Sequence, residues 1–222
     1  MTDLTTIEAS WDQAAAHDAM WNIITDPTRI NGGWTPEDFF AHGRTEVDNA
    51  IARLSDLGVN YGTIRALDFG CGMGRVTQAL AEHFTRIDGV DISAEMIRLA
   101  REHKPTPYRP RFHHNTTADL RLFKARSFDF VYSMIVLQHM PQTFQEGYVR
   151  EFFRVLKPGG VTMFEMPDGP DEGHPGWPLS MYGVARDTAE QWIADAGGSL
   201  VDVEDLGHDA QWQCYRYTAV RV

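Results

Sequence analysis

Cysteine is scarce in this chain, because only Cys71 and Cys214 occur among its 222 residues. Two such distant cysteines predict no disulfide framework, and we expect the reducing cytoplasm as the setting. No apolar run approaches the ~20 residues that cross a bilayer. The N-terminus also has no basic stretch followed by an apolar one. We therefore expect neither a membrane partner nor a signal peptide.

Basic residues are also few. The 20 Lys and Arg are outnumbered by 31 Asp and Glu, which gives a net charge of −11. Because phosphates would be repelled over much of such a surface, we expect no nucleic-acid partner. No Gly-Lys-Ser or Gly-Lys-Thr follows the glycine-rich run, which excludes a phosphate-loop NTPase. The composition leaves the oligomeric state open, a homodimer included.

The most informative stretch is a glycine-rich run, in which Gly70, Gly72 and Gly74 are spaced G-x-G-x-G. An apolar segment precedes the run, and a second apolar segment ends at Asp91, 17 positions after the last glycine. Glycine takes positive φ readily and lets a ligand approach the backbone. An acidic residue after the next strand can bind a ribose diol. The pattern predicts a nucleoside cofactor beside a loop with free amides at a helix N-terminus.

The glycine spacing also discriminates between cofactors. A dinucleotide fingerprint needs G-x-G-x-x-G, but Arg75 stands in the place of its last glycine, which disfavours an oxidoreductase. Asp68 would repel a pyrophosphate and attract an ammonium group. This D-x-G-x-G-x-G run, followed by Val90-Asp91-Ile92-Ser93, resembles motif I and the next motif of class I S-adenosylmethionine-dependent methyltransferases. The resemblance implies S-adenosylmethionine as cofactor and S-adenosylhomocysteine as product.

The order of expected elements agrees with that resemblance. Residues 1–60 should form a helical cap, with helices at 10–24, capped by Ser10, and at 35–57, capped by Thr35. Residues 61–222 should form the cofactor-binding domain, because strands and helices alternate there as in a parallel sheet. The expected strands are 65–69, 86–90, 111–114, 128–133, 160–166, 200–206 and 211–220, and the expected helices are 74–83, 94–104, 143–156 and 187–196. No helix separates the last two strands, so the seventh should be antiparallel. This is the Rossmann-like α/β fold with a seven-stranded, mostly parallel sheet.

The resemblance also implies cofactor contacts. Asp68 would lie near the cofactor amine and Asp91 on its ribose. Backbone and apolar contacts would come from Gly70, Cys71, Gly72, Gly74, Ile92 and Met134. Either Thr116 or Asp119 would contact the adenine amine. Arg44, on the second helix, could pair with the cofactor carboxylate.

The acceptor side centres on His139, which follows the fourth strand. Ligands of this fold bind outside the carboxyl ends of strands, so His139 could serve as the general base for a hydroxyl acceptor. It could instead cap a helix or pack under the cofactor. Acceptor contacts are expected from Glu165, His174, Trp177 and Tyr182. The acidic group Asp168, Asp171, Glu172 and His174 could bind Mg²⁺, but a solvated loop is favoured and no metal is predicted.

The predicted function is methylation of a small molecule, with a hydroxyl of a sugar or secondary metabolite as acceptor. The chain resembles bacterial methyltransferases of such pathways, including saccharide O-methyltransferases of actinobacteria. Two alternatives stay open: an N-methyltransferase that acts on a small amine, and a non-catalytic subunit that binds the cofactor with the same fold.

Overall fold

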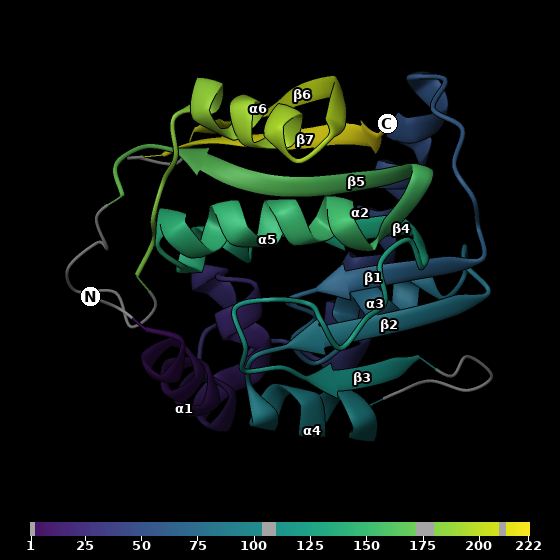
Figure 1. Cartoon of the computed structure of the whole chain (residues 1–222). Helices are drawn as coiled ribbons and strands as arrows, with labels where there is room; N and C mark the ends of the chain where they lie inside the picture. Colours follow the sequence, from purple (N-terminus) through teal and green to yellow (C-terminus); the bar gives the residue numbers. More distant parts are fainter. Residues whose placement is uncertain (1–2, 104–109, 172–179, 209–211) are drawn as a thin grey trace. The chain divides into compact units, whose positions relative to one another are not determined.

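The computed structural model describes residues 3–103, 110–171, 180–208 and 212–222 (Figure 1). The chain divides into two compact units. We call residues 5–116 the N-terminal unit, and residues 117–222 with residues 1–4 the C-terminal unit. No helix within the described residues combines the length and the apolar character that a membrane crossing requires. The expected division at residue 60 stays a prediction.

The N-terminal unit contains the first three strands. Its elements are α1 (Leu4–Ile23), η1 (Pro27–Arg29), α2 (Pro36–Asp56), β1 (Arg65–Phe69), α3 (Arg75–Leu80), β2 (Arg86–Asp91), α4 (Ala94–Glu102) and β3 (Arg111–His114). Strand β2 lies between β1 and β3 and is parallel to both, with Phe69 opposite Val90 and Asp91 opposite His114. The arrowheads of the three strands point the same way in Figure 1, so their carboxyl ends share one edge.

The C-terminal unit contains the other four strands. Its elements are β4 (Phe128–Ser133), η2 (Leu137–His139), α5 (Gln142–Val155), β5 (Leu156–Asp168), α6 (Arg186–Asp195), β6 (Gly198–His208) and β7 (Gln213–Arg221). Their order is β4-β5-β7-β6. Strands β4 and β5 are parallel, and β7 is antiparallel to both β5 and β6. The prediction of an α/β fold with seven strands, the last antiparallel, is therefore confirmed.

The helix caps were predicted with mixed success. Thr35 caps α2, because its hydroxyl accepts a hydrogen bond from the Asp38 amide at 3.1 Å. Ser10 does not cap a helix, since α1 begins at Leu4 and the Ser10 hydroxyl donates to the Thr6 carbonyl inside the helix. The six residues from Leu4 to Ala9 therefore belong to the first turns of α1, and the sequence analysis did not include them in the helix.

A kink interrupts α1 at Asp18, whose φ of −155° and ψ of 82° are not helical. Its carboxylate accepts hydrogen bonds from the amides of Trp21 at 3.3 Å and Gly32 at 2.8 Å. The side chain thus caps the last turn of α1 and fixes the following loop, as Asp does at helix N-termini.

Apolar packing joins the helices of the N-terminal unit to the glycine-rich loop. Trp34 and Phe39 pack with Ala15 of α1, Met73 of the loop and Met96 of α4 in one buried cluster. In the C-terminal unit, Phe164 of β5 packs between Phe152 of α5 and Tyr217 of β7.

A buried carboxylate, Asp88 of β2, joins the three strands of the N-terminal unit on one face. It accepts hydrogen bonds from Arg65 at 2.8 Å and Arg111 at 2.9 Å, and it contacts His113 Nε2 at 2.8 Å. Burial alone would raise the pKa of Asp88, but the hydrogen bonds from His113, Arg65 and Arg111 outweigh burial and lower it to about 2. His113 is therefore a structural histidine.

We expect Asp88→Asn to reduce the free energy of unfolding by about 3 kcal/mol, because the change removes the buried charge that binds Arg65, Arg111 and His113. The ionised carboxylate stabilises the fold above the unfolded pKa, and this contribution, about 2 kcal/mol, is lost as the pH falls toward 2. Urea unfolding at several pH values measures the difference between the two proteins. A difference that stayed constant between neutral and acid pH would contradict this assignment. Asp48→Asn, which alters an exposed pair with His83, is the matched control.

Candidate functional site

The glycine-rich loop connects β1 to α3, and all three of its glycines take positive φ. The values are 71° at Gly70, 50° at Gly72 and 87° at Gly74, which other residues adopt only with strain. Four of the five amides between residues 70 and 74 already donate hydrogen bonds within the protein. The expectation of free amides is therefore wrong. The amides hold the loop in shape instead of pointing at an anionic ligand.

Asp91, at the end of β2, connects this loop to the next one. Its carboxylate accepts hydrogen bonds from the amides of Gly72 and Ser93, each at 2.8 Å. Burial raises the pKa of Asp91, although these amides act in the opposite direction. Two backbone donors fix the orientation of the carboxylate, and each oxygen has a further lone pair that can accept from a ligand hydroxyl.

Helix α1 packs directly against these two loops. The Asp12 carboxylate accepts from the Ser93 hydroxyl at 2.6 Å and from the Glu95 amide at 3.1 Å. A Cβ on Gly72 would lie 2.7 Å from Ile23 Cδ1, and one on Gly74 would lie 2.9 Å from the Phe112 ring. Close packing within the protein thus requires glycine at both positions. The role of these glycines toward a cofactor stays a prediction.

Asp68 is buried in β1, with 3% of its surface exposed. The Thr77 hydroxyl of α3 donates to its carboxylate at 2.5 Å. Burial raises the pKa of Asp68 to about 7, while Thr77 and Arg75 lower it and Glu46 and Asp91 raise it. Near neutral pH, Asp68 is therefore a carboxyl group in balance between its neutral and ionised forms.

The other predicted cofactor residues of the N-terminal unit differ in their surroundings. Arg44 and Thr116 are exposed. The Ile92 carbonyl contacts His114 Nε2 at 2.9 Å. Cys71 is buried, and burial raises the pKa of its thiol, so it is a neutral packing group.

Arg75 is a buried residue of the site that the sequence reasoning missed. It directly follows Gly74, and its guanidinium forms an ion pair with Glu46 of α2 at 2.6 Å. The sequence reasoning used Arg75 only against a dinucleotide. A charged residue at the first position of a helix after a glycine loop was the available signal, but its partner is 29 positions away.

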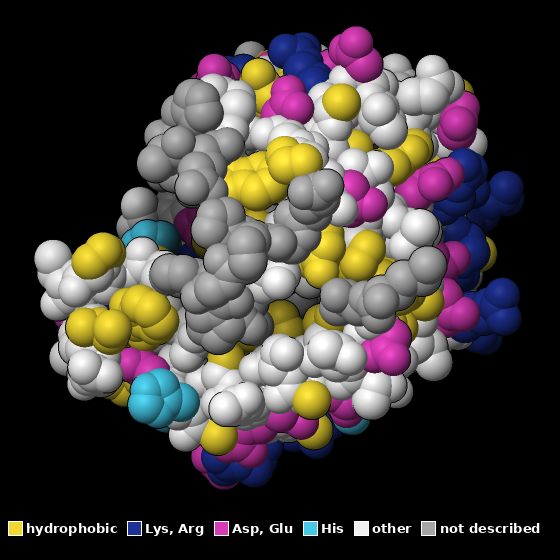
Figure 2. Space-filling view, turned by 90° about the vertical axis from the view of Figure 1, so that its left-hand side faces the viewer, with side chains coloured by type: hydrophobic (Ala, Val, Ile, Leu, Met, Phe, Trp, Pro, Cys, Tyr) yellow, Lys and Arg dark blue, Asp and Glu magenta, His cyan; other side chains and the backbone are white. Residues whose placement is uncertain are grey.

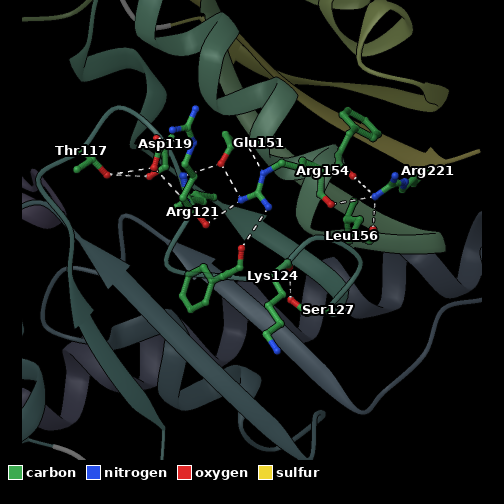
Figure 3. A network of polar contacts seen from close by, with 12 residues as sticks. Thr117, Asp119, Arg121, Lys124, Ser127, Glu151, Arg154, Leu156 and Arg221 are labelled. Carbon is green, nitrogen blue, oxygen red and sulfur yellow. Dashed lines mark hydrogen bonds and ion pairs between the residues drawn. The ribbon is translucent and has the colours of Figure 1, made fainter.

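Asp119 lies in a segment of the C-terminal unit that α5 holds in place (Figure 3). Glu151 accepts from the Leu120 amide at 2.6 Å, and Arg154 donates to the carbonyls of Leu120 and Phe123. The Asp119 carboxylate accepts from the Arg121 amide at 3.0 Å. The choice between Thr116 and Asp119 as the adenine contact stays open.

His139 ends η2, directly after β4 and its connecting turn. Its Nδ1 lies 3.3 Å from the Ser180 carbonyl oxygen. Because a carbonyl only accepts, Nδ1 carries the proton in the neutral ring and Nε2 carries the lone pair. Burial lowers the pKa of His139 to about 4, which the hydrogen bond to Ser180 only partly offsets. The imidazole is therefore neutral at physiological pH.

A second segment fixes the turn that contains His139. The Tyr182 amide donates to the Gln138 carbonyl at 2.7 Å. Gln145 of α5 is fully buried, and its Nε2 lies within 3.1 Å of the carbonyl oxygens of Leu137, Met140 and Tyr182. Tyr182 itself is buried, and its expected contact with the acceptor stays a prediction.

The turn between β4 and η2 is strained. Met134 is buried, and the next residue, Ile135, takes a φ of 58°. A β-branched residue in the left-handed region costs ~1–3 kcal/mol, and such strain is concentrated at functional sites. The strain shows that the surrounding contacts hold this turn in one conformation.

The remaining predicted acceptor residues are only partly described. Glu165 of β5 forms an ion pair with Arg216 of β7 at 3.0 Å. His174 and Trp177 lie outside the described residues, as does Glu172. The described residues contain no group of three or more metal-binding side chains. On the face drawn in Figure 2, magenta Asp and Glu side chains are interspersed with hydrophobic ones.

Comparison with known proteins gives a consistent result. Residues 66–160 match the family described as a methyltransferase domain. Trans-aconitate 2-methyltransferase of Azoarcus sp. (strain BH72) is 33% identical over 136 residues, which cover 60% of this chain and 48% of that protein. Ubiquinone biosynthesis O-methyltransferase of Xanthomonas oryzae pv. oryzae is 30% identical over 115 residues, which cover 51% of this chain and 45% of that protein. The chain thus spans about half the length of these curated relatives.

A solved structure has a similar fold over nearly the whole chain. Magnesium protoporphyrin IX methyltransferase from Synechocystis PCC 6803, crystallised with bound SAH, superposes with a TM-score of 0.70. It covers 99% of this chain and 100% of that one, at 20% sequence identity. This likeness confirms the Rossmann-like fold.

The packing of Ile23 against Gly72 can be tested by Gly72→Ala. We expect this change to reduce the free energy of unfolding by ~1–3 kcal/mol more than Gly58→Ala, because only the first adds a steric overlap. Both glycines take positive φ, but a Cβ on Gly58 would meet nothing within 4 Å. Thermal or urea unfolding measures both effects.

The double variant Gly72→Ala, Ile23→Ala completes the comparison. If the overlap causes the loss, removing the Ile23 side chain should make the Gly72→Ala change less costly. Equal costs of Gly72→Ala in the two backgrounds would show that α1 does not pack on the loop.

Proposed function

We propose that this protein is a methyltransferase that uses S-adenosylmethionine to methylate a small molecule, because residues 66–160 match a methyltransferase domain. One observation carries the proposal: two backbone amides, of Gly72 and Ser93, hold the Asp91 carboxylate at the end of β2. A carboxylate in this place is suited to a ribose diol.

The residues of the N-terminal unit fit this cofactor. Positive φ at all three glycines gives a compact turn beside Asp91. The loop amides are used within the protein, which suits a cofactor without phosphate groups. Asp68 offers a carboxyl group for the ammonium end of the ligand. When bound, S-adenosylmethionine supplies an electrophilic methyl group on a sulfonium.

We assign the chemical role to His139 and the acceptor role to a hydroxyl. The Nε2 lone pair of His139 can accept the hydroxyl proton, and the Nδ1 proton of the same ring is held by the Ser180 carbonyl. Gln145 and the Tyr182 amide hold the turn that carries the ring. The related trans-aconitate and ubiquinone enzymes act on small molecules by their names, which supports an acceptor of this size.

Within this proposal the finer acceptor class is a hydroxyl of a sugar or secondary metabolite. A screen that measures S-adenosylhomocysteine release from panels of alcohols, phenols and amines tests it. Turnover with hydroxyl compounds alone supports O-methylation. Turnover with amines alone would replace it by N-methylation, and no turnover despite tight cofactor binding would favour a non-catalytic subunit.

The ribose contact is tested by Asp91→Ala. We expect a loss of about 10- to 100-fold in affinity for S-adenosylhomocysteine, because one charged hydrogen-bond acceptor contributes ~1.5–3 kcal/mol. Isothermal titration calorimetry measures the affinity.

An analogue of S-adenosylhomocysteine that lacks both ribose hydroxyls shows whether Asp91→Ala weakens binding through the lost ribose contact or through a distorted loop. The wild type should bind the analogue as weakly as the variant does. If Asp91→Ala weakens the analogue further, the residue acts through the loop and not through the diol. Asp12→Ala, which acts on the loop through Ser93, is the control.

The role of His139 is tested by His139→Ala with an acceptor from the screen. Loss of a general base should reduce kcat by ~10²–10⁴-fold while the affinity for S-adenosylhomocysteine stays near normal. Because the pKa of His139 is about 4, the ring stays neutral as the pH falls from neutral toward that value. The kcat of the wild type should therefore show no acid limb near 6.5. Normal turnover of the variant would remove His139 from the reaction.

A further inference from the structure

A buried amide in the C-terminal unit joins the turn that carries His139 to a second segment of the chain. The side chain of Gln145, on α5, is fully buried. Its Nε2 lies 3.0 Å from the carbonyl oxygens of Leu137 and Met140, on either side of His139 in the chain. The same nitrogen lies 3.1 Å from the Tyr182 carbonyl oxygen. Because an amide nitrogen has two hydrogens, Gln145 can donate to the turn and to the second segment at the same time.

The turn has few hydrogen bonds of its own. The His139 amide donates to the Val136 carbonyl at 3.0 Å. The Met140 amide donates to the Leu137 carbonyl at 3.3 Å, and such short turns have poor hydrogen-bond geometry. Ile135, which begins the turn, has the strained φ of 58°. The position of the His139 ring therefore depends on contacts from outside the turn.

The second segment, residues 180–184, supplies the contact to the ring itself. The Ser180 carbonyl oxygen lies 3.3 Å from His139 Nδ1. Two residues later, the Tyr182 amide donates to the Gln138 carbonyl at 2.7 Å. The Ser180 carbonyl can face Nδ1 only while this segment stays against the turn, and Gln145 binds both.

The other end of the Gln145 amide shows what the side chain is for. Its Oε1 is buried and accepts no hydrogen bond from the described residues. An unsatisfied buried acceptor destabilises a protein, and an apolar side chain would avoid that cost. Filling the space under the turn therefore does not require an amide, whereas joining carbonyl groups of two segments does.

We propose that Gln145 is a positioning residue for His139: it holds the turn and residues 180–184 together, keeps the Ser180 carbonyl on Nδ1, and so keeps the lone pair on Nε2. Gln145 acts through His139, and no contact with the acceptor is required of it. The catalytic meaning of this inference rests on the proposed function, because it assumes that His139 is the general base.

The expected effect follows from the chemistry of imidazole. The hydrogen bond that one ring nitrogen makes decides which nitrogen carries the proton. Without Gln145, the Ser180 carbonyl is no longer fixed opposite Nδ1, and the ring of His139 can take either tautomer and turn. A ring with its proton on Nε2 cannot accept the hydroxyl proton there. A misplacement of about 1 Å can cost about 100-fold in rate.

The first experiment measures the tautomer of His139 in the ligand-free protein. Gln145→Met keeps an unbranched side chain of similar length but removes the donor. Nitrogen NMR near neutral pH distinguishes the two tautomers, because the pKa of His139 is about 4 and the ring is neutral there. His139→Gln assigns the signal. We expect one tautomer, with the proton on Nδ1, in the wild type and a mixture in Gln145→Met. The same single tautomer in both proteins would overturn the proposal.

The second experiment measures turnover with an acceptor from the screen. We expect Gln145→Met to lower kcat by ~10- to 100-fold, while the affinity for S-adenosylhomocysteine stays at the wild-type value. An unchanged kcat would contradict the proposal. An equal loss of kcat and of cofactor affinity would indicate a general structural defect, which would also contradict it.

Two further variants separate positioning from folding. Gln142, also on α5, donates to the Gly183 carbonyl at 2.9 Å, so Gln142→Met removes one bond to the second segment and none of those that Gln145 makes to the turn. It should leave the tautomer and kcat unchanged, and effects equal to those of Gln145→Met would overturn the assignment to Gln145. Gln145→Asn keeps a buried amide that is one methylene shorter. It should change the tautomer and kcat in the same direction, and it carries the test if Gln145→Met does not fold.

The tautomer measurement also separates this inference from the proposed function. If no acceptor is methylated, the proposed function fails, yet a tautomer change in Gln145→Met and not in Gln142→Met would still support control of the ring by Gln145. If methylation occurs and all variants show the wild-type tautomer, the inference about Gln145 fails alone.

Discussion

The hydrogen bond from the Gly72 amide to the Asp91 carboxylate is the contact on which the arrangement of the N-terminal unit depends. It joins the loop after β1 to the end of β2, and the Ser93 amide binds the other oxygen of the same carboxylate. Ser93 in turn donates its hydroxyl to Asp12, which brings α1 against both loops. One side chain therefore holds the loop, the strand end and, through Ser93, the covering helix. Such a carboxylate is oriented before any ligand arrives, so that less ordering is needed on binding.

The fold was predictable because its signals are local. Three glycines in a short run, apolar strands and the Thr35 cap each depend on residues close in sequence, and the structure agrees with them. The failures have a different origin. Ser10 was taken as a cap because serine is a preferred N-cap residue, but α1 already begins at Leu4. The loop amides were expected to be free, but three of the four bonded amides have their acceptors on β2, which are visible only after the strands pair.

Electrostatic partners explain most of what the sequence could not predict about the site. Arg75 is adjacent to the most informative motif of the chain, yet its meaning depends on Glu46, which α2 brings to it. The turn at Ile135 is similar, because no local sequence signal predicts a φ of 58° at a β-branched residue. Sequence pattern identifies which residue types are present near a site, whereas burial decides their charge. Asp68 and His139 were both named from position alone, and only their surroundings show that burial favours the neutral form of each.

The opposite consequences of burial at these two residues bear on how the proposed enzyme would respond to pH. Desolvation raises the pKa of a carboxyl and lowers that of an imidazole. The pKa of Asp68 therefore lies above that of His139, which reverses the usual order of the two residue types. Asp68 would change its charge at about 7, while His139 would keep its lone pair down to about 4. Between these values, the imidazole is ready to accept a proton, but the carboxyl that would hold the ammonium group is increasingly neutral. Acid would therefore reduce the affinity for the cofactor before it reduces the chemical step. An enzyme that depends on both groups would lose activity at low cofactor concentration first, and excess cofactor would restore it.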